Sequence, residues 1–253
     1  MNAWETRLAE LPAVALAELE DEYALLTRVD RKYIVSPAVW ADVMADVEGL
    51  RALEIDGVRS FGYESVYYDT PELHSYRDAA RRRPARYKVR TREYLDTGGR
   101  AIEVKLRSPK GETVKHREWL ADDAPTDLLE GAARAFVASF PQVGAAVDDL
   151  APVLTTRYRR ATLVAHGARV TVDTGVTGIS AEGPSIDFGG ALIVETKSSM
   201  RAGDVDRALW ARGIRPTRVS KYCTTLAALQ PDLPSNRWSR TLRRHLTTAA
   251  HAA

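Results

Sequence analysis

The sequence contains one cysteine, Cys223, among 253 residues. A single cysteine excludes an internal disulfide, which is typical of a protein that folds in a reducing compartment. No apolar run approaches the roughly 20 residues that a transmembrane helix needs, and the acidic N-terminal stretch is unlike a signal peptide. We therefore expect a cytoplasmic protein with no transmembrane segment of its own.

Common nucleotide-binding and metal-binding motifs are also missing. The sequence has no GxxxxGK[ST] loop and no GxGxxG turn between a strand and a helix. The five histidines show no metal-ligand spacing, and Cys223 has no clear activating partner beyond the nearby Lys221. Trp40, Trp119 and Trp210 fall on apolar sides of their segments, and we interpret them as core residues. These patterns disfavour a P-loop fold, a Rossmann fold and a histidine-bound metal centre.

Alternating β-branched and aromatic residues predict eight strands, most of them joined by hairpins. Ser36 and Pro37 mark the start of a helix after the first strand, and Gly49 is positioned to close it. Further helices are predicted near Val14–Leu25, from about 70 to 80, at 125–140, 203–213 and 220–230, with a helix or loose tail at the C-terminal end. The predicted strands are 27–35, 63–70, 87–94, 100–108, 112–120, 152–165, 168–178 and 190–199.

Charged side chains share one face of strand after strand. In "YKVRTREY" (87–94), the cations Lys88, Arg90 and Arg92 alternate with Val89 and Thr91, so the three cations point the same way. A single strand of this kind is commonly the solvated side of a sheet. Charged residues share one face in the other predicted strands as well. The sets are Arg28, Asp30 and Lys32; Glu103, Lys105 and Arg107; Lys115 and Arg117; Arg160; Arg169 and Asp173; and Glu195 and Lys197.

The repetition of this pattern in many strands indicates that the charged face binds an anion rather than facing solvent alone. Like charges directly opposite each other across strands are destabilising, so a face made largely of Arg and Lys repels itself until an anion neutralises it. In a closed sheet the apolar side packs on helices, and low-dielectric walls strengthen the field inside. Arginine forks match phosphate oxygens, and sparse carboxylates suit Mg²⁺, which takes one or two together with substrate phosphates.

These features together predict an α+β fold whose single antiparallel sheet curls or closes into a barrel. If it closes, a closed antiparallel β-barrel of about eight strands, with helices packed outside and at the ends, would form a basic tunnel. The predicted domain spans residues 1–235, followed by a C-terminal helix or tail at 236–253. A narrow tunnel suits a linear phosphate chain and excludes duplex nucleic acid. Single strands usually need aromatic platforms, and the charged faces offer few.

The order and spacing of the motifs resemble the VTC domain, from about residue 25 to 229. The shared motifs include "RVDRKYIV", "YKVRTREY", "IEVKLRS", "IVETKSS" and "VSKYCTTL". This is the catalytic domain of the vacuolar transporter chaperone polyphosphate polymerase, in the triphosphate tunnel metalloenzyme (CYTH-like) superfamily. The resemblance implies a β-barrel tunnel that transfers the γ-phosphate of ATP to polyphosphate with Mn²⁺ or Mg²⁺. Asp30 departs from the family, which usually has glutamate there.

The resemblance also implies roles for individual residues. Glu195 in "VETK" matches the metal-binding glutamate, and Lys115 and Arg117 match a basic pair. The charge pattern adds Arg28, Lys88, Arg169 and Lys197 as substrate-binding residues. The residues predicted to act in catalysis are Lys32, Arg90, Arg92, Lys105, Arg160 and Lys221.

Three functions remain open from the sequence. The favoured one is a polyphosphate polymerase; the others are a tripolyphosphatase or related triphosphate phosphohydrolase, and a non-catalytic polyphosphate-binding module. The expected small-molecule partners are ATP and inorganic polyphosphate or triphosphate. Because no membrane-spanning segment is predicted, export of the product would require a separate membrane-protein partner.

Overall fold

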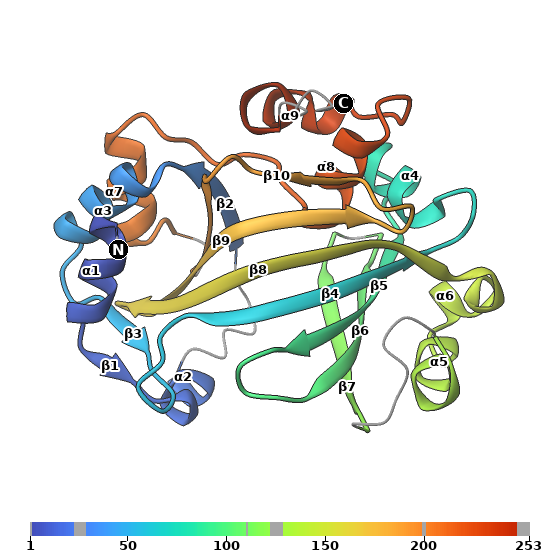
Figure 1. Cartoon of the computed structure of the whole chain (residues 1–253), viewed down its shortest axis with the longest axis horizontal. Coiled ribbons are helices and arrows are strands. Elements are labelled where there is room, and N and C mark those ends of the chain that lie inside the picture. Colours follow the sequence, from blue (N-terminus) through green and yellow to red (C-terminus); the bar gives the residue numbers. More distant parts are fainter. Residues whose placement is uncertain (1, 23–28, 110, 122–128, 199–200, 247–253) are drawn as a thin grey trace. The chain divides into compact units, whose positions relative to one another are not determined.

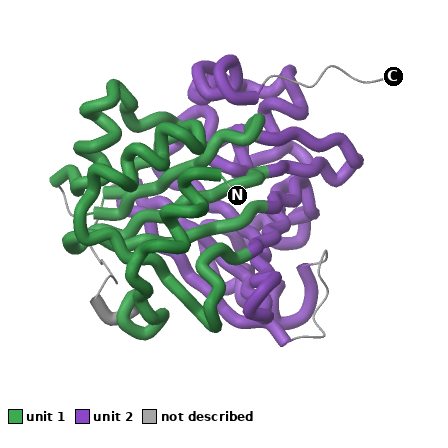
Figure 2. The backbone as a smooth tube through the Cα atoms, turned by 60° about the vertical axis from the view of Figure 1, so that its left-hand side comes forward, with its two compact units in different colours: residues 1–61, 158–176, 188–219 green, residues 62–157, 177–187, 220–253 purple. Residues whose placement is uncertain are grey.

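A computed structural model describes residues 2–22, 29–109, 111–121, 129–198 and 201–246 (Figure 1). The chain divides into two compact units, drawn in green and purple in Figure 2. Unit 1 comprises residues 1–61, 158–176 and 188–219, and unit 2 comprises 62–157, 177–187 and 220–253. No helix among the described residues is long and apolar enough to cross a membrane. The predicted boundary between residues 235 and 236 stays a prediction.

The sheet of unit 1 is built from strands that are distant in sequence. β2 (Val29–Val35) pairs antiparallel with β11 (Leu192–Ser198), and β11 pairs antiparallel with β9 (Ala168–Ser180). β8 (Ala151–Ala165) follows β9 in the hydrogen-bonded order. The short β3 (Arg51–Leu53) pairs with β8, and β1 (Ala13–Val14) pairs with β3. The helices of this unit are α1 (Ala3–Glu10), α2 (Leu16–Glu22), α3 (Pro37–Asp46) and α7 (Asp204–Ala211).

One face of the unit 1 sheet forms a hydrophobic core with α1, α3 and α7. Tyr33, Val172 and Val194 are fully buried and alternate with the charged positions of their strands. Trp40 of α3 and Leu209 of α7 are fully buried against this face. The predicted apolar face is therefore confirmed for these strands, and the charged residues occupy the other face.

Asp206 fixes α7 to the sheet from inside unit 1. Its carboxylate is completely buried and accepts hydrogen bonds from the Tyr33 hydroxyl at 2.7 Å and the Thr196 hydroxyl at 2.6 Å. The backbone N–H of Gly203 donates to it at 3.0 Å, and Arg31 forms an ion pair with it at 3.3 Å. One carboxylate thus joins β2, β11 and the start of α7.

Unit 2 contains an antiparallel meander of β4 (Phe61–Asp69), β5 (Arg86–Tyr94), β6 (Arg100–Arg107) and β7 (Thr113–Leu120). β8 lies next to β4 in the strand order, and β10 (Ser185–Asp187) pairs with the end of β9. The accompanying helices are α4 (His74–Ala80), α5 (Gly131–Ala138), α6 (Pro141–Gly144), α8 (Lys221–Leu229) and α9 (Ser239–His245). Short 3₁₀ helices cover Val147–Asp149 and Asn236–Trp238.

Apolar side chains of unit 2 pack on the face of the meander opposite the cations. Val89, Ile102 and Val104 are fully buried in one cluster with Val137 of α5. At the β4 end, the completely buried carboxylate of Asp69 accepts backbone N–H groups at the start of α4 and the Tyr222 hydroxyl of α8, the latter at 2.6 Å. This carboxylate therefore holds both helices against β4.

The eight predicted strands are all present, and Ser36 caps α3 by accepting the Val39 backbone N–H at 3.3 Å. The helix ends at Asp46, before the predicted Gly49, and α1, β1, β3 and β10 were not predicted. The described strand pairing ends at β2 and at β7. This pairing confirms the α+β class and the large antiparallel sheet, but it does not show the predicted closed barrel. The sequence pattern could not settle closure, because alternation assigns the faces of a strand and not its neighbours.

Replacing Asp206 by alanine is expected to lower the free energy of unfolding by about 3–5 kcal/mol, because it removes one partner of a buried ion pair. Urea denaturation followed by circular dichroism measures this change. Asp204→Ala, in the same helix but in an exposed ion pair, serves as the control and should cost less than about 1 kcal/mol. Equal effects of the two substitutions would contradict the role assigned to Asp206.

Candidate functional site

The registers of β5, β6 and β7 bring charged residues of three strands into two rows on one face of unit 2. Arg90 lies opposite Glu103, which lies opposite Arg117. In the neighbouring row, three lysines are directly opposite one another across the strands: Lys88, Lys105 and Lys115. The sequence predicted this shared face, and only the pairing shows which charges meet.

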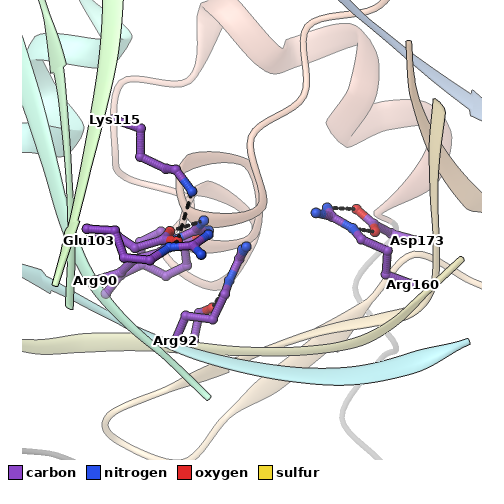
Figure 3. Close-up of polar contacts among 9 residues, drawn as sticks. Arg90, Arg92, Glu103, Lys115, Arg160 and Asp173 are labelled. Atoms are coloured by element: carbon purple, nitrogen blue, oxygen red, sulfur yellow. Dashed lines mark hydrogen bonds and ion pairs between the residues drawn. The ribbon is translucent and has the colours of Figure 1, made fainter. Parts of the chain in front are cut away.

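Glu103 is the centre of the first row. Its side chain is 2% exposed, and Arg90 donates to Oε2 from Nε at 2.8 Å and from Nη2 at 2.6 Å. Lys115 and Arg117 donate to Oε1, each at 3.2 Å. Figure 3 shows Arg90 and Lys115 directed at this carboxylate. One buried carboxylate therefore orders three cations drawn from two strands, and we name Arg90, Glu103, Lys115 and Arg117 the Glu103 cluster.

The cations control the protonation of this cluster. Burial raises the pKa of Glu103, but Arg90, Arg92 and Lys115 outweigh burial and hold that pKa well below its usual range. Burial lowers the pKa of Lys115 to about 8, against the opposing effect of Glu103. Glu103 is thus ionised at neutral pH, and Lys115 loses its charge only as the pH rises through about 8.

Tyr67 of β4 lies opposite Arg90 and extends the row of Arg90, Glu103 and Arg117 beyond β5. Its hydroxyl accepts a hydrogen bond from Arg90 Nη1 at 2.9 Å, and its ring stacks on Tyr222 with centroids 5.0 Å apart. Burial raises the pKa of the Tyr67 hydroxyl, but Arg90, Arg92 and other cations of unit 2 outweigh burial and lower it to about 8. The lowered pKa indicates how strongly positive this part of unit 2 is.

Two further cations lie at the start of α8: Lys88 contacts it from β5, and Lys221 belongs to it. Lys88 donates to the hydroxyl of Ser220, the N-cap of α8, at 2.9 Å, and its Nζ lies 5.9 Å from the centre of the Tyr222 ring. Lys221 is the first residue of this helix and contributes to the positive field around Tyr67. The helix start is thus held beside the lysine row.

Unit 1 carries a separate set of charged residues. Lys32 Nζ lies 3.4 Å from Glu195 Oε2, and Lys197 donates to Glu195 Oε1. In the same unit, Arg160 forms a bidentate pair with buried Asp173, with N–O distances of 2.6 and 2.9 Å (Figure 3). We name Lys32, Glu195 and Lys197 the Glu195 cluster.

Glu195 has the properties of a ligand to a hard divalent cation. Burial raises the pKa of Glu195, but Lys32, Lys197 and Arg160 outweigh it and hold the pKa well below its usual range. Within the described parts of the chain, no group of three or more His, Cys, Asp or Glu could hold a metal ion. One ionised carboxylate fits Mg²⁺ or Mn²⁺ when phosphate oxygens and water supply the other ligands. The residues therefore fit a metal that binds together with a phosphate substrate.

The structure locates most of the residues predicted for the site. Lys32, Arg160, Arg169, Glu195 and Lys197 lie in unit 1; Lys88, Arg90, Arg92, Lys105, Lys115, Arg117 and Lys221 lie in unit 2. Arg169 lies opposite Lys197 in the β9–β11 pairing, and Lys105 is exposed. Arg28 lies outside the described residues. The roles of these residues in binding or catalysis stay predictions.

Sequence reasoning missed Tyr67 and misplaced Trp119. Tyr67 has no motif of its own, and its part in the row depends on the β4–β5 register that sets it opposite Arg90. The core assignment of Trp119 is wrong, because its side chain is 57% exposed. Trp119 has the same parity as Lys115 and Arg117 on β7, so alternation already placed it on the cationic face.

Sheet faces rich in Arg and Lys, ordered by single ionised carboxylates, define a class of site suited to polyanions. The sequence matches the VTC domain family over residues 27–230, and the chain belongs to that family. No curated protein matches the chain.

The chain also aligns with several solved structures. A candidate adenylate cyclase from Vibrio parahaemolyticus aligns with a TM-score of 0.45 and 12% identity, over 78% of this chain and 97% of its own. One from Bacillus halodurans aligns with a TM-score of 0.48 and 13% identity, over 77% and 94%. A candidate adenylyl cyclase from Hippeastrum with a dominant triphosphatase activity aligns with a TM-score of 0.49 and 14% identity, over 78% and 94%.

Glu103→Gln is expected to lower the free energy of unfolding at pH 7 by about 2–3 kcal/mol, because the cations lose their shared carboxylate. The folded pKa of Glu103 lies below its unfolded value of about 4.3. Its ionised form therefore stabilises the fold above that pH, and the stabilisation is lost as the pH falls further.

Urea denaturation at pH 7 and at about pH 3 should accordingly show a smaller difference between wild type and variant in acid. Glu118→Gln, an exposed position on the opposite side of β7, is the matched control and should change little at either pH. A difference for Glu103→Gln that does not depend on pH would contradict the assigned ionisation.

Proposed function

We propose that the chain is a metal-dependent polyphosphate polymerase that transfers the γ-phosphate of ATP to a polyphosphate chain in a basic tunnel. The observation that carries the proposal is the Glu103 cluster with its neighbouring lysine row on β5, β6 and β7. Membership of the VTC domain family supports an activity on polyphosphate or triphosphate. Closure of the sheet into the tunnel belongs to the proposal.

The charge balance of β5–β7 favours a long phosphate chain as ligand. Among the described residues of these strands, Glu103 is the one carboxylate that shares a face with six predicted site cations: Lys88, Arg90, Arg92, Lys105, Lys115 and Arg117. Directly opposed lysines repel one another, and adjacent strands are only about 4.8 Å apart. A flexible chain of phosphates laid across the rows would neutralise several of these cations at once.

The Glu195 cluster supplies the features that a metal needs in this reaction. Lys32 and Lys197 contact different oxygens of Glu195, so they fix the orientation of the carboxylate and keep it ionised. A bound divalent cation would neutralise charge on the phosphate oxygens during transfer. In our proposal, Glu195 holds that ion, and Arg160, oriented by Asp173, binds phosphate oxygens beside it.

The proposed reaction moves one phosphoryl group. A terminal phosphate oxygen of the acceptor chain bonds to the γ-phosphorus of ATP, the bond from that phosphorus to the β–γ bridging oxygen breaks, and ADP leaves with the bonding electrons. The acceptor oxygen is already ionised, so no strong base is required. The protein contributes positioning and charge neutralisation. Water in place of the acceptor would give hydrolysis.

Purified protein incubated with ATP and Mn²⁺ is expected to produce long polyphosphate chains, measured together with free phosphate. Glu195→Gln should abolish turnover, because the metal loses its carboxylate ligand, while binding of tripolyphosphate persists. Glu182→Gln, an exposed acidic position in unit 2, is the control and should keep wild-type turnover. Wild-type turnover by Glu195→Gln would overturn the metal assignment.

The products separate the three functions that the sequence left open. Long chains identify a polymerase. Free phosphate without chains would contradict the proposal in favour of a phosphohydrolase, and binding of triphosphate without any turnover would contradict it in favour of a binding module.

The affinity for tripolyphosphate is expected to fall about tenfold as the pH rises through about 8, because Lys115 loses its charge. Lys115→Arg should reduce this fall, since the guanidinium stays charged, and Tyr67→Phe separates the contribution of the neighbouring phenol. Isothermal titration calorimetry between pH 7 and about pH 9 measures both. An identical pH dependence in wild type and Lys115→Arg would contradict the assignment.

A further inference from the structure

We propose that Tyr63, Tyr94 and Trp119 form a platform that stacks on the base of a nucleoside triphosphate, at one end of the cationic face of unit 2. We name these three residues the aromatic platform. The inference rests on the proposed function and deepens it, because it identifies the site that distinguishes the nucleotide donor from the inorganic phosphate chain.

The three rings form a continuous aromatic surface across β4, β5 and β7. Tyr63 lies opposite Tyr94 in the β4–β5 pairing, and their rings meet edge to face with centroids 5.2 Å apart. The centroid of Trp119 lies 5.4 Å from that of Tyr94. The indole is 57% exposed, so the platform presents a large aromatic surface to solvent.

Glycine at position 99 allows the close approach of the indole to the β5–β6 turn. Gly99 has a φ of +87°, and a Cβ there would lie 3.3 Å from Cζ3 of Trp119. Any larger residue would meet both a strained backbone and a tight contact. The indole is thus supported from the backbone of unit 2 while most of its surface stays open to a ligand.

Arginines join the aromatic platform to the phosphate-binding rows. The guanidinium of Arg117 lies 5.4 Å from the Trp119 ring and 5.9 Å from the Tyr94 ring, while its Nε donates to Glu103. The guanidinium of Arg92 lies 5.3 Å from the Tyr63 ring. The same arginine that belongs to the Glu103 cluster is therefore also in contact with the platform.

The order of groups along β7 matches the order of groups in a nucleoside triphosphate. Residues on one face of a strand are about 6.7 Å apart, so Trp119 lies one such step beyond Arg117 and two beyond Lys115. Phosphates bound at Lys115 and Arg117 would place the ribose alongside the Arg117 guanidinium, which itself lies against the indole. The base would then lie on the aromatic platform.

The chemistry of the candidate ligands singles out the nucleotide. Inorganic polyphosphate has no apolar or aromatic group and gains nothing from an exposed indole, whereas a base gains about 1–3 kcal/mol by stacking on an aromatic side chain. Stacking tolerates every base, because each has a π-face. The platform therefore favours nucleoside triphosphates as donors and binds larger purines more tightly than pyrimidines, without strict selection of adenine.

Affinities for ATP and for inorganic tripolyphosphate, measured by isothermal titration calorimetry in Mg²⁺, test the inference. Trp119→Ala is expected to weaken ATP binding about tenfold, corresponding to a loss of about 1.4 kcal/mol, and to change tripolyphosphate binding less than twofold. Trp119→Phe should retain most of the ATP affinity. Arg90→Ala, in the Glu103 cluster, should weaken both ligands. Val114→Ala, 52% exposed on the other face of β7, is the matched control and should weaken neither.

Unchanged ATP affinity in Trp119→Ala would overturn the inference, and so would an equal loss of both ligands, which indicates a structural role. Loss of binding to a short single-stranded RNA with ATP affinity unchanged would overturn it in favour of an RNA platform. Failure of wild type to bind either ligand would overturn the proposed function and the inference with it. Thermal melting of each variant confirms that the fold is retained.

Discussion

Neutralisation of like charge on a sheet face is the constraint on which the structure of unit 2 depends. Arg90 on β5 and Lys115 and Arg117 on β7 would repel one another, and Glu103 on β6 between them is the buried carboxylate that holds them together. Its cost of burial is offset only because several cations reach it. The cations on this face outnumber the Glu103 carboxylate, and in our proposal they bind a phosphate chain.

Two buried carboxylates of a different kind fix the elements that frame these faces. Asp206 joins β2 and β11 to α7 in unit 1, and Asp69 joins β4 to α4 and α8 in unit 2. Asp69 accepts hydrogen bonds from neutral donors, and Asp206 accepts several neutral donors besides its ion pair with Arg31, whereas Glu103 and Glu195 are surrounded by cations. These four carboxylates therefore divide into two that anchor helices and two that order cations, and we propose that these cations bind an anionic ligand.

ATP, the proposed donor, and polyphosphate, the proposed acceptor, each contain a chain of phosphates. They differ because ATP carries a nucleoside at one end of its chain. Cationic rows bind phosphates whatever group the chain carries at its end, so they cannot by themselves distinguish ATP from polyphosphate. The aromatic platform supplies an interaction that the nucleotide alone can make. Arg117, in contact with Glu103 on one side and with Tyr94 and Trp119 on the other, connects the two parts of this face.

The alternation of residue types is enough to assign the apolar and the charged side of β5 and β6, because successive residues of a strand point to opposite faces. Val89 and Val104 are buried and Arg90 is on the other face, as that period requires. Ser36 likewise identified the start of α3 through its capping chemistry. Alternation does not reveal which strands are neighbours or in what register they pair, because pairing depends on contacts between segments that are distant in the sequence. The meeting of Arg90 with Glu103 and the place of Tyr67 beside them both result from that register.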